Sequence, residues 1–380
     1  MSQNTPLPSR SSRRASVPKA PKKKTGGGFR WGRFIFIILS LAIVLLAGYV
    51  AYLYYGSYKP NLAKIAKQED GTGVSIKIPK EESAKVKPIS LVLLGLDTRS
   101  ETGSMNTDVM MVAAFNPQSK TATVVSIPRD SSLAVDGYKK HKANGYYAAF
   151  YMYGKNNEKL EKEKLPGYAR DETKLLLSRF FDIPIDYTAV IDFQGFVDVV
   201  DALGGVTVNV DQNMRYVDSA DGTDINLTKG EQQLDGEQAL GFVRYRKSNT
   251  NKNFKPTAES SDFARNERQN QVLGAIADRM KSLGSVTKVG GLLDAVGNNL
   301  RTDIPAVQIE NIIATYFGIN RSDIRFIPLT GTWRSPYVYL DEDKFAEAKR
   351  ALNEELNQDG RGGSAEVSAT SETSASDSKN

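Results

Sequence analysis

Residues 89–130 read ISLVLLGLDTRSETGSMNTDVMMVAAFNPQSKTATVVSIPRD, and this stretch decides the fold class. Ile89–Leu94 is a nearly continuous apolar run that stops at Gly95-Leu96-Asp97, which predicts a buried strand ended by a turn. Residues 109–115 and 121–127 are two more strand-like runs, separated by a turn signal at Asn116-Pro117. Three clustered strands indicate a sheet at the centre of the fold.

The sequence that follows alternates between helical and strand patterns. Helices are predicted at 144–153, 171–181, 193–203, 237–241 and 263–280, and further strands at 206–210 and 324–328. Gly204-Gly205 lies in the C-terminal cap position of the third helix. This alternation predicts an α/β fold, specifically an α-β-α sandwich with a central mixed sheet.

The composition excludes several kinds of active site. Among 380 residues there is no cysteine and only one histidine, His141. The chain therefore has no disulfide scaffold, thiolate nucleophile or cysteine zinc site. A single histidine also excludes a multi-histidine metal centre. Catalysis would have to rest on carboxylates, Lys and Arg, hydroxyls or a hard metal ion.

The net charge of +6 is unevenly distributed. The first 33 residues hold nine Lys and Arg and no acidic residue, so the rest holds 41 of the 50 basic residues against 44 acidic ones, a balance of −3. The basic excess thus belongs to a tail and not to the body of the protein. We therefore expect no nucleic-acid partner.

A long uncharged segment follows the basic tail. Phe34–Tyr55 has 22 residues without a charge, and a helix needs about 20 to cross a bilayer. This length exceeds the apolar core of a cleavable signal peptide, about 7 to 15 residues, so an uncleaved anchor is favoured over that alternative. Since the basic residues precede the span, the N-terminus is expected in the cytoplasm and the body outside the cell, in a single-pass protein of the cell membrane.

The predicted organisation has five parts. They are a basic disordered cytoplasmic tail at 1–33, a transmembrane helix at 34–55, a polar stalk at 56–84, an extracellular body at 85–355 and a disordered tail rich in Ser and Thr at 356–380. A body of about 270 residues is compatible with one large α/β domain.

Two aspartates lie where sheet proteins commonly place their ligand sites, just past strand ends. Asp97 follows the first predicted strand and Asp108 opens the second. Together they could hold a hard cation such as Mg²⁺, which takes one or two carboxylates with waters and substrate phosphates. The alternative is that Asp97 is a turn residue and Asp108 caps the start of a strand. Taken alone, these two positions favour that alternative.

Basic residues form two further groups. Arg129-Asp130 directly ends a strand, which fits either an anion site or an exposed ion pair. In extended chain, Arg244 and Arg246 would share a face. On the next predicted helix, Arg265, Arg268 and Gln269 also share a face. Guanidinium groups bind phosphate oxygens through two parallel hydrogen bonds, so this group points to a diphosphate or polyanionic ligand, with a solvated basic face as the alternative.

The motifs occur in a fixed order along residues 88–282. They are Gly95 to Arg99, Asp108, Ser126-Ile127-Pro128-Arg129-Asp130, Lys142-x-Asn144, Asp201-Ala202-Leu203-Gly204-Gly205-Val206, Leu234-Asp235-Gly236-x-x-Ala239-Leu240, Arg244-x-Arg246 and Asp262-x-x-Arg265-x-x-Arg268-Gln269. This succession resembles the LytR-CpsA-Psr (LCP) family of Gram-positive cell-wall enzymes, which also begins with a short cytoplasmic tail and a single span.

The resemblance implies a transferase that moves a glycopolymer of the teichoic acid or capsule type from an undecaprenyl-diphosphate carrier onto peptidoglycan. The bond formed would be a phosphodiester to a muramoyl hydroxyl, and Mg²⁺ would be the cofactor. The alternative is a non-catalytic membrane protein that binds polyprenyl phosphates or wall polymers and serves a regulatory role.

The resemblance also assigns roles to residues. Asp97 and Asp108 match the Mg²⁺-associated aspartates, and Asp97, Arg99 and Asp130 are the candidate catalytic residues. The carrier's diphosphate would be held by Arg129, Lys142, Arg244, Arg246, Arg265, Arg268 and Gln269. One departure is Asn106, which stands where the family often has a basic residue.

The carrier's hydrocarbon chain would need an apolar groove. The aromatic stretch Tyr146, Tyr147, Phe150, Tyr151 and Tyr153 could line one. Packing in the core explains the same stretch at least as well.

Overall fold

The protein is described here by a computed structural model, which places residues 78–97, 105–219, 222–249, 257, 259–282, 292, 297 and 299–357. The predicted cytoplasmic tail at 1–33 and transmembrane helix at 34–55 lie outside these residues, as does the C-terminal tail from 358 onward. Across the described ranges, the helices are too short or too polar to cross a membrane.

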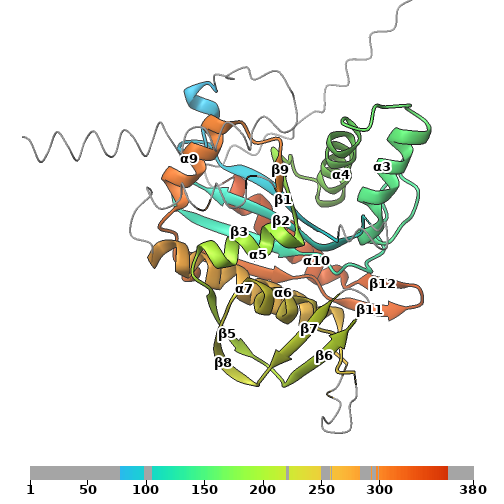
Figure 1. Cartoon of the computed structure of the whole chain (residues 1–380). Coiled ribbons are helices and arrows are strands. Elements are labelled where there is room, and N and C mark those ends of the chain that lie inside the picture. The colour runs from blue at the N-terminus through green and yellow to red at the C-terminus, as the bar shows by residue number, and fades with distance from the viewer. Residues whose placement is uncertain are drawn as a thin grey trace, which may run out of the picture. The chain divides into compact units, whose positions relative to one another are not determined.

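A six-stranded mixed sheet lies at the centre of the body (Figure 1), with the order β10-β3-β2-β1-β4-β9. Its strands are β1 (Ile89–Leu96), β2 (Thr107–Asn116), β3 (Thr121–Ser126), β4 (Tyr187–Asp192), β9 (Leu300–Thr302) and β10 (Ile324–Pro328). β1 pairs with β4 and β10 with β3 in parallel, whereas the other neighbouring strands are antiparallel. The predicted α/β fold with a central mixed sheet is confirmed.

Helices cover both faces of this sheet (Figure 1). One face carries α3 (Tyr146–Asn156), α4 (Leu165–Phe181) and α10 (Glu342–Leu356), and the other carries α5 (Phe193–Ala202), α6 (Gly236–Arg244) and α7 (Asp262–Ser282). Along β2, Met110 and Val112 pack on the first face, and Met111 packs on the second. Since successive side chains alternate between two buried faces, the strands are apolar at nearly every position.

The sequence did not predict β4 and β9 of the sheet, α10, one further helix, one short strand and two short hairpins. β5 (Val206–Val210), which was predicted, pairs with β8 (Gly230–Leu234), and β6 (Met214–Asp218) pairs with β7 (Thr223–Leu227). β11 (Gly331–Arg334) pairs with β12 (Tyr337–Leu340), and α9 (Ala306–Tyr316) follows β9. The buried side chains of β5 and β6 share a core with α6 and α7, which packs these two strand pairs against the helices.

The last residues of the predicted stalk are part of the folded body. Gln308 of α9 is fully buried and accepts a hydrogen bond from the amide N of Ala84 (3.2 Å). It also donates to the carbonyl O of Glu82 (3.0 Å). Residues 82–84 are therefore tied to α9.

The close contact of α5 and α6 depends on Gly236. A Cβ at this position would lie 2.8 Å from Val197 Cα and 2.5 Å from the Val197 carbonyl O. The Gly236 amide also donates to Asp201 Oδ1 at 2.7 Å. Two of the sequence motifs, around Asp201 and Gly236, thus serve the packing of two helices.

We expect Gly236→Ala to lower the free energy of unfolding by about 1–3 kcal/mol, because backbone must move to admit the methyl group. Chemical denaturation of the full-length protein in detergent would measure the loss. Gly167→Ala is the control, since a Cβ there meets no atom within 4 Å. Equal midpoints for the two variants would contradict the close contact.

Candidate active site

A β-bulge brings Asp108 to the site. Gly95 pairs with Val109 and Leu96 pairs with Thr107, so Asp108 is an extra residue in β2. In a regular strand Asp108 would point to the same face as Met110, toward α3 and α4. The bulge turns it to the α7 face, where it lines two adjoining pockets.

Asp97 is the first residue after β1 and is only 6% exposed. Its amide N donates to the carbonyl O of Asn106 at 3.0 Å, which closes the segment between β1 and β2. Asp97 and Asp108 line the same pocket. The structure therefore brings together the two carboxylates that the sequence placed at neighbouring strand ends.

Arg129 adds a cation to this pair. Its Nη1 donates to Asp108 Oδ1 at 2.5 Å, and both side chains are largely buried. Its Nε is buried and has no hydrogen-bond partner within the described part of the chain. A buried N–H of a charged group without an acceptor costs free energy. An anionic ligand would supply that acceptor.

Two more arginines come from consecutive helices. Arg244 is the last residue of α6, and its guanidinium lies 4.4 Å from the centroid of the Phe193 ring. Arg265 lies in the first turn of α7 and is 6% exposed. Arg244 and Arg265 both line the two adjoining pockets.

The helix predicted at 237–241 is α6, which extends through Arg244, so the interpretation of Arg244 as part of an extended chain with Arg246 was wrong. A capping box between Asp235 and Gln238 begins α6, and its buried apolar residues carry the helix through Arg244. Arg246 follows the helix end and still lines the pocket. Arg244 and Arg246 therefore line the same pocket because one ends α6 and the other follows it, and not because they alternate along a strand.

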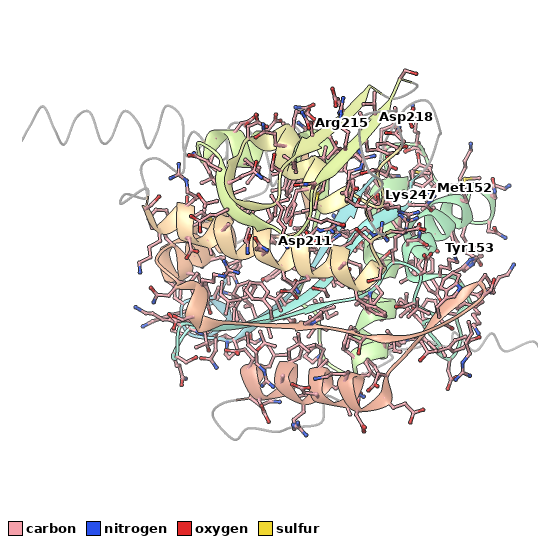
Figure 2. The ribbon with its side chains drawn as sticks, turned by 90° about the horizontal axis from the view of Figure 1, so that it is seen from below. Met152, Tyr153, Asp211, Arg215, Asp218 and Lys247 are labelled. Carbon is pink, nitrogen blue, oxygen red and sulfur yellow. The ribbon has the colours of Figure 1, made fainter. Side chains whose placement is uncertain are left out.

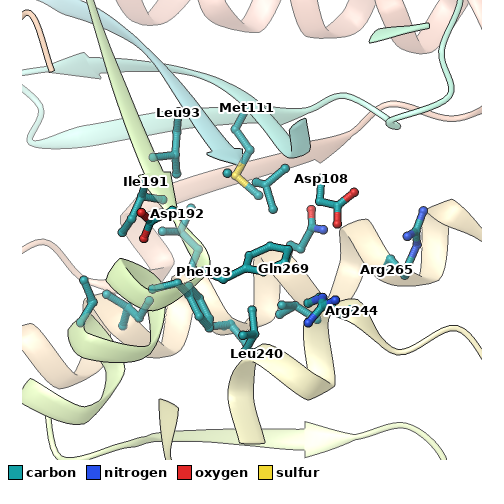
Figure 3. Close-up of a pocket in the computed structure, with 18 residues that line it drawn as sticks. Leu93, Asp108, Met111, Ile191, Asp192, Phe193, Leu240, Arg244, Arg265 and Gln269 are labelled. Carbon is teal, nitrogen blue, oxygen red and sulfur yellow. The ribbon is translucent and has the colours of Figure 1, made fainter. Parts of the chain in front are cut away.

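The two pockets differ in character and share three residues. The polar pocket is lined by Asp97, Asp108, Arg129, Arg244, Arg246 and Arg265, among others. The apolar pocket is lined by residues that include Leu93, Met111, Phe193, Phe196, Leu240 and Val272. Asp108, Arg244 and Arg265 belong to both. Figure 3 shows these charged groups at one end of the apolar pocket and Leu93 and Ile191 toward the other. Gln269, a predicted ligand, lines the apolar pocket.

Two of the other predicted residues, Lys142 and Asp130, lie outside both pockets. Lys142 forms an ion pair with Asp130 (Nζ to Oδ1, 2.9 Å), and its Nζ lies 5.4 Å from the Trp333 ring centroid. Neither residue lines the polar or the apolar pocket. Arg99 is outside the described residues.

Arg268 is a structural brace. It is 2% exposed and its guanidinium donates to Asp211 Oδ1 and Oδ2 (2.8 Å each), to the Tyr245 carbonyl O (3.0 Å) and to Ser260 Oγ (3.0 Å). Four of the five N–H groups of an arginine are thus used within the fold. The structure does not place Arg268 with the predicted diphosphate ligands.

Most of the aromatic stretch of α3 packs in the core, whereas Tyr153 is 48% exposed. Tyr146 and Tyr147 are 1% and 2% exposed and pack against the sheet with Leu176 and Leu177. The apolar pocket lies on the opposite face, so this stretch does not line it. His141 packs edge-on against Tyr146 (5.4 Å between ring centroids) and lines neither pocket.

The donor set of the polar pocket fits a hard cation that is completed by other ligands. Among the described residues there is no group of three or more His, Cys, Asp or Glu able to enclose a metal ion. Asp97 and Asp108 offer carboxylate oxygens only. Two carboxylates with waters and substrate phosphates are the usual surroundings of Mg²⁺ in proteins.

Sequence reasoning missed one wall of the polar pocket. Tyr216, Asp218 and Thr223 of the β6–β7 hairpin line it, as does Lys247. Tyr216 and Val217, which are residue types common in strands, are the signal that could have revealed the strand. Its two strands are short, which makes that signal weak.

Comparison with known proteins gives one family. The model of the LytR_cpsA_psr family matches residues 52–355. Similar curated proteins include the polyisoprenyl-teichoic acid--peptidoglycan teichoic acid transferase TagV of Bacillus subtilis (strain 168), 27% identical over 332 residues, which cover 85% of this chain and 78% of that protein. The transferase of the same description named TagU from Bacillus mycoides (strain KBAB4) is 31% identical over 292 residues, covering 75% and 83%.

Solved structures of similar proteins match this chain over most of its length. The crystal structure of B. subtilis TagV superposes with a TM-score of 0.55 at 28% identity, over 71% of this chain and 98% of that one. The structure of TagT bound to LI-WTA superposes with a TM-score of 0.52 at 29% identity, over 74% and 96%.

Proposed function

Because the chain belongs to the LytR_cpsA_psr family, we propose that it transfers an anionic or secondary cell-wall glycopolymer from an undecaprenyl-diphosphate carrier to peptidoglycan, forming a phosphodiester. Relatives that match most of its length are named polyisoprenyl-teichoic acid--peptidoglycan teichoic acid transferases. The polymer is of the teichoic acid or capsule type.

The observation that carries this proposal is the junction of the two pockets. A lipid-linked diphosphate has an apolar chain, then two phosphates, then a polymer. The apolar pocket suits the chain, and Arg244 and Arg265 lie where it meets the polar pocket. Charge-assisted hydrogen bonds from guanidinium groups are strong phosphate contacts. The sequence of chemical groups in the donor thus matches the order of the two pockets.

The reaction breaks the bond between the two phosphates of the lipid carrier. The acceptor hydroxyl attacks the phosphorus next to the sugar, a new P–O bond forms, and the bond to the carrier's phosphate breaks to release undecaprenyl phosphate. Arg129, Arg244 and Arg265 hold the phosphate oxygens and neutralise the charge that develops on them. Asp97, nearly buried in the same pocket, accepts the proton of the acceptor hydroxyl.

We also propose Mg²⁺ as the cofactor, held by Asp97 and Asp108. Its chemistry would be charge neutralisation at the diphosphate oxygens. Support comes from the carboxylate oxygens of Asp97 and Asp108, which line the same pocket.

The place of the reaction is a further part of the proposal. Residues 34–55 would anchor the protein in the cell membrane by a single span, with the N-terminus in the cytoplasm and the body outside. The charge-free segment and the nine basic residues before it support this orientation. A body held at the membrane would meet a lipid-linked donor at high local concentration.

The transfer itself is tested with the full-length protein in detergent. It is incubated with a lipid diphosphate-linked disaccharide, Mg²⁺ and peptidoglycan, and the products are lipid monophosphate and glycan bound to peptidoglycan. Release of lipid monophosphate that requires peptidoglycan supports the transferase. Donor binding without such release would favour the non-catalytic binding protein.

We expect Asp97→Asn to lower kcat by about 10²- to 10⁴-fold, because the amide cannot accept the proton. Raising the Mg²⁺ concentration should not restore it. Asp108→Asn should regain part of its activity at high Mg²⁺, since it weakens a metal ligand and the ion pair with Arg129 but leaves the proton acceptor Asp97 in place. Recovery of Asp97→Asn at high Mg²⁺ would show that Asp97 acts only as a metal ligand.

A further inference from the structure

One face of the β6–β7 hairpin forms a wall of the polar pocket. The register pairs Tyr216 with Ile225 and Asp218 with Thr223. Side chains two apart in a strand, and those directly opposite across a pair, share a face. All four line the polar pocket. We call Tyr216, Asp218 and Thr223 the hairpin wall.

The chemistry of the hairpin wall differs from that of the rest of the pocket. Its polar groups are one carboxylate and two hydroxyls, and Tyr216 Oη donates to Asp218 Oδ2 at 3.2 Å. A carboxylate repels a diphosphate, whereas it accepts hydrogen bonds from hydroxyl groups. Tyr and Thr hydroxyls can both donate and accept. The wall therefore suits an uncharged polyhydroxylated molecule, which is a sugar.

The hairpin wall is held in place relative to the basic segment beside it. The amide N of Val217 donates to Asn249 Oδ1 at 2.9 Å, and the amide N of Arg215 donates to Ser248 Oγ at 3.3 Å. Residues 246–249 directly follow α6, so these bonds tie β6 to the chain that carries Arg246 and Lys247. Figure 2 shows Asp218 and Lys247 at the same end of the molecule, and both line the polar pocket.

We propose that the hairpin wall is the binding site for the acceptor sugar. Asp218 and Tyr216 bond to hydroxyls of the peptidoglycan saccharide and hold its reactive hydroxyl toward the phosphorus bound by the arginines. This inference rests on the proposed function, whose second substrate it locates. The wall residues form and break no covalent bond. The new P–O bond, the departing undecaprenyl phosphate and the transfer of the proton to Asp97 are as described above.

The test compares amide and phenyl variants in the full-length protein. Asp218→Asn and Tyr216→Phe should each raise KM for the peptidoglycan acceptor about 10- to 100-fold, the range expected for loss of one hydrogen bond to a charged group or its partner. KM for the lipid diphosphate-linked disaccharide should not rise by more than about twofold, since these residues do not bind the donor.

Asp224→Asn is the matched control. Asp224 lies on the same hairpin but its position alternates with the wall residues, and its side chain is 63% exposed in an ion pair with Arg215. It makes the same change of acid to amide on the opposite face. Its kinetic constants should equal those of the wild type. A rise in KM for the donor in Asp218→Asn, or equal acceptor constants for Asp218→Asn and Asp224→Asn, would overturn the proposal.

A second measurement separates this inference from the proposed function. Titration calorimetry with a soluble disaccharide-peptide fragment of peptidoglycan needs no donor and no turnover. Binding by the wild type and by Asp224→Asn, with at least tenfold weaker binding by Asp218→Asn, supports the acceptor site even if transfer is not observed. If the wild type transfers glycan but Asp218→Asn binds the fragment as tightly as the wild type, the acceptor site is refuted and the transferase stands.

Discussion

Replacing Arg244 with alanine should lower kcat/KM for the lipid-linked donor by roughly 10²- to 10³-fold, the loss seen when one group that stabilises developing charge is removed. Arg244 is placed for this because it lines both pockets and its guanidinium rests on the Phe193 ring. Release of lipid monophosphate measures the effect. Arg244→Lys should fall between the wild type and alanine, since it keeps the charge but loses the two parallel hydrogen bonds of a guanidinium.

Arg325→Ala provides the matched control for Arg244→Ala. Arg325 lies on β10 with its side chain 49% exposed and pairs with Glu347 at 3.1 Å. Exposed pairs contribute little to stability, so this variant should behave as the wild type. Activity of Arg244→Ala within twofold of the control would remove Arg244 from the diphosphate site. Unfolding midpoints of the two variants should agree, which separates a loss of chemistry from a loss of structure.

Arg268→Ala, in contrast to Arg244→Ala, should lower the stability of the fold. We expect a loss of about 3 kcal/mol in the free energy of unfolding, the lower end of the range for breaking a buried charged pair. The lower end applies because the Asp211 side chain is 49% exposed. The substitution also leaves the carbonyl O of Tyr245 without the donor that it has at 3.0 Å. Denaturant unfolding measures the loss. A stable Arg268→Ala protein with impaired donor binding would restore the role that the sequence suggested.

The pH dependence of stability gives a second readout for this pair. Burial alone would raise the pKa of Asp211, but the hydrogen bonds and charge of Arg268 outweigh it and hold that pKa below its ordinary value. A lowered carboxyl pKa stabilises the folded state above the ordinary pKa of about 4, and this stability is lost as the pH falls through the lowered value. The difference between the wild type and Arg268→Ala should be constant near neutrality and shrink in acid.

Four of the six strands of the sheet, β1, β2, β3 and β10, and the two aspartates of the site could be predicted from the sequence because their signals are local. The apolar runs 89–94 and 109–115 have buried side chains on both faces, which leaves little choice but a central strand. The positions of Asp97, just after β1, and Asp108, near the start of β2, could then be predicted from the ends of these strands. Antiparallel pairing of β1 with β2 brings the end of one to the start of the other, so the two carboxylates meet in one pocket.

Roles that depend on distant partners could not be read in the same way. Arg265 and Arg268 are three apart on α7 and the sequence treats them alike. Only the folded chain shows that Arg268 meets Asp211, 57 residues earlier, whereas Arg265 faces the pockets. Lys142 and Asp130 likewise form an ion pair with each other, which the sequence alone does not show. The sequence did not predict the hairpin wall, because the short strands of a two-stranded hairpin have too few residues to show a clear periodic pattern.

The bulge in β2 separates what the fold needs from what the chemistry needs. Asp108 is surplus to the ladder between β1 and β2, since the pairs on either side of it, Gly95 with Val109 and Leu96 with Thr107, already connect the strands. Removal of the Asp108 side chain would therefore leave both of these pairs in place.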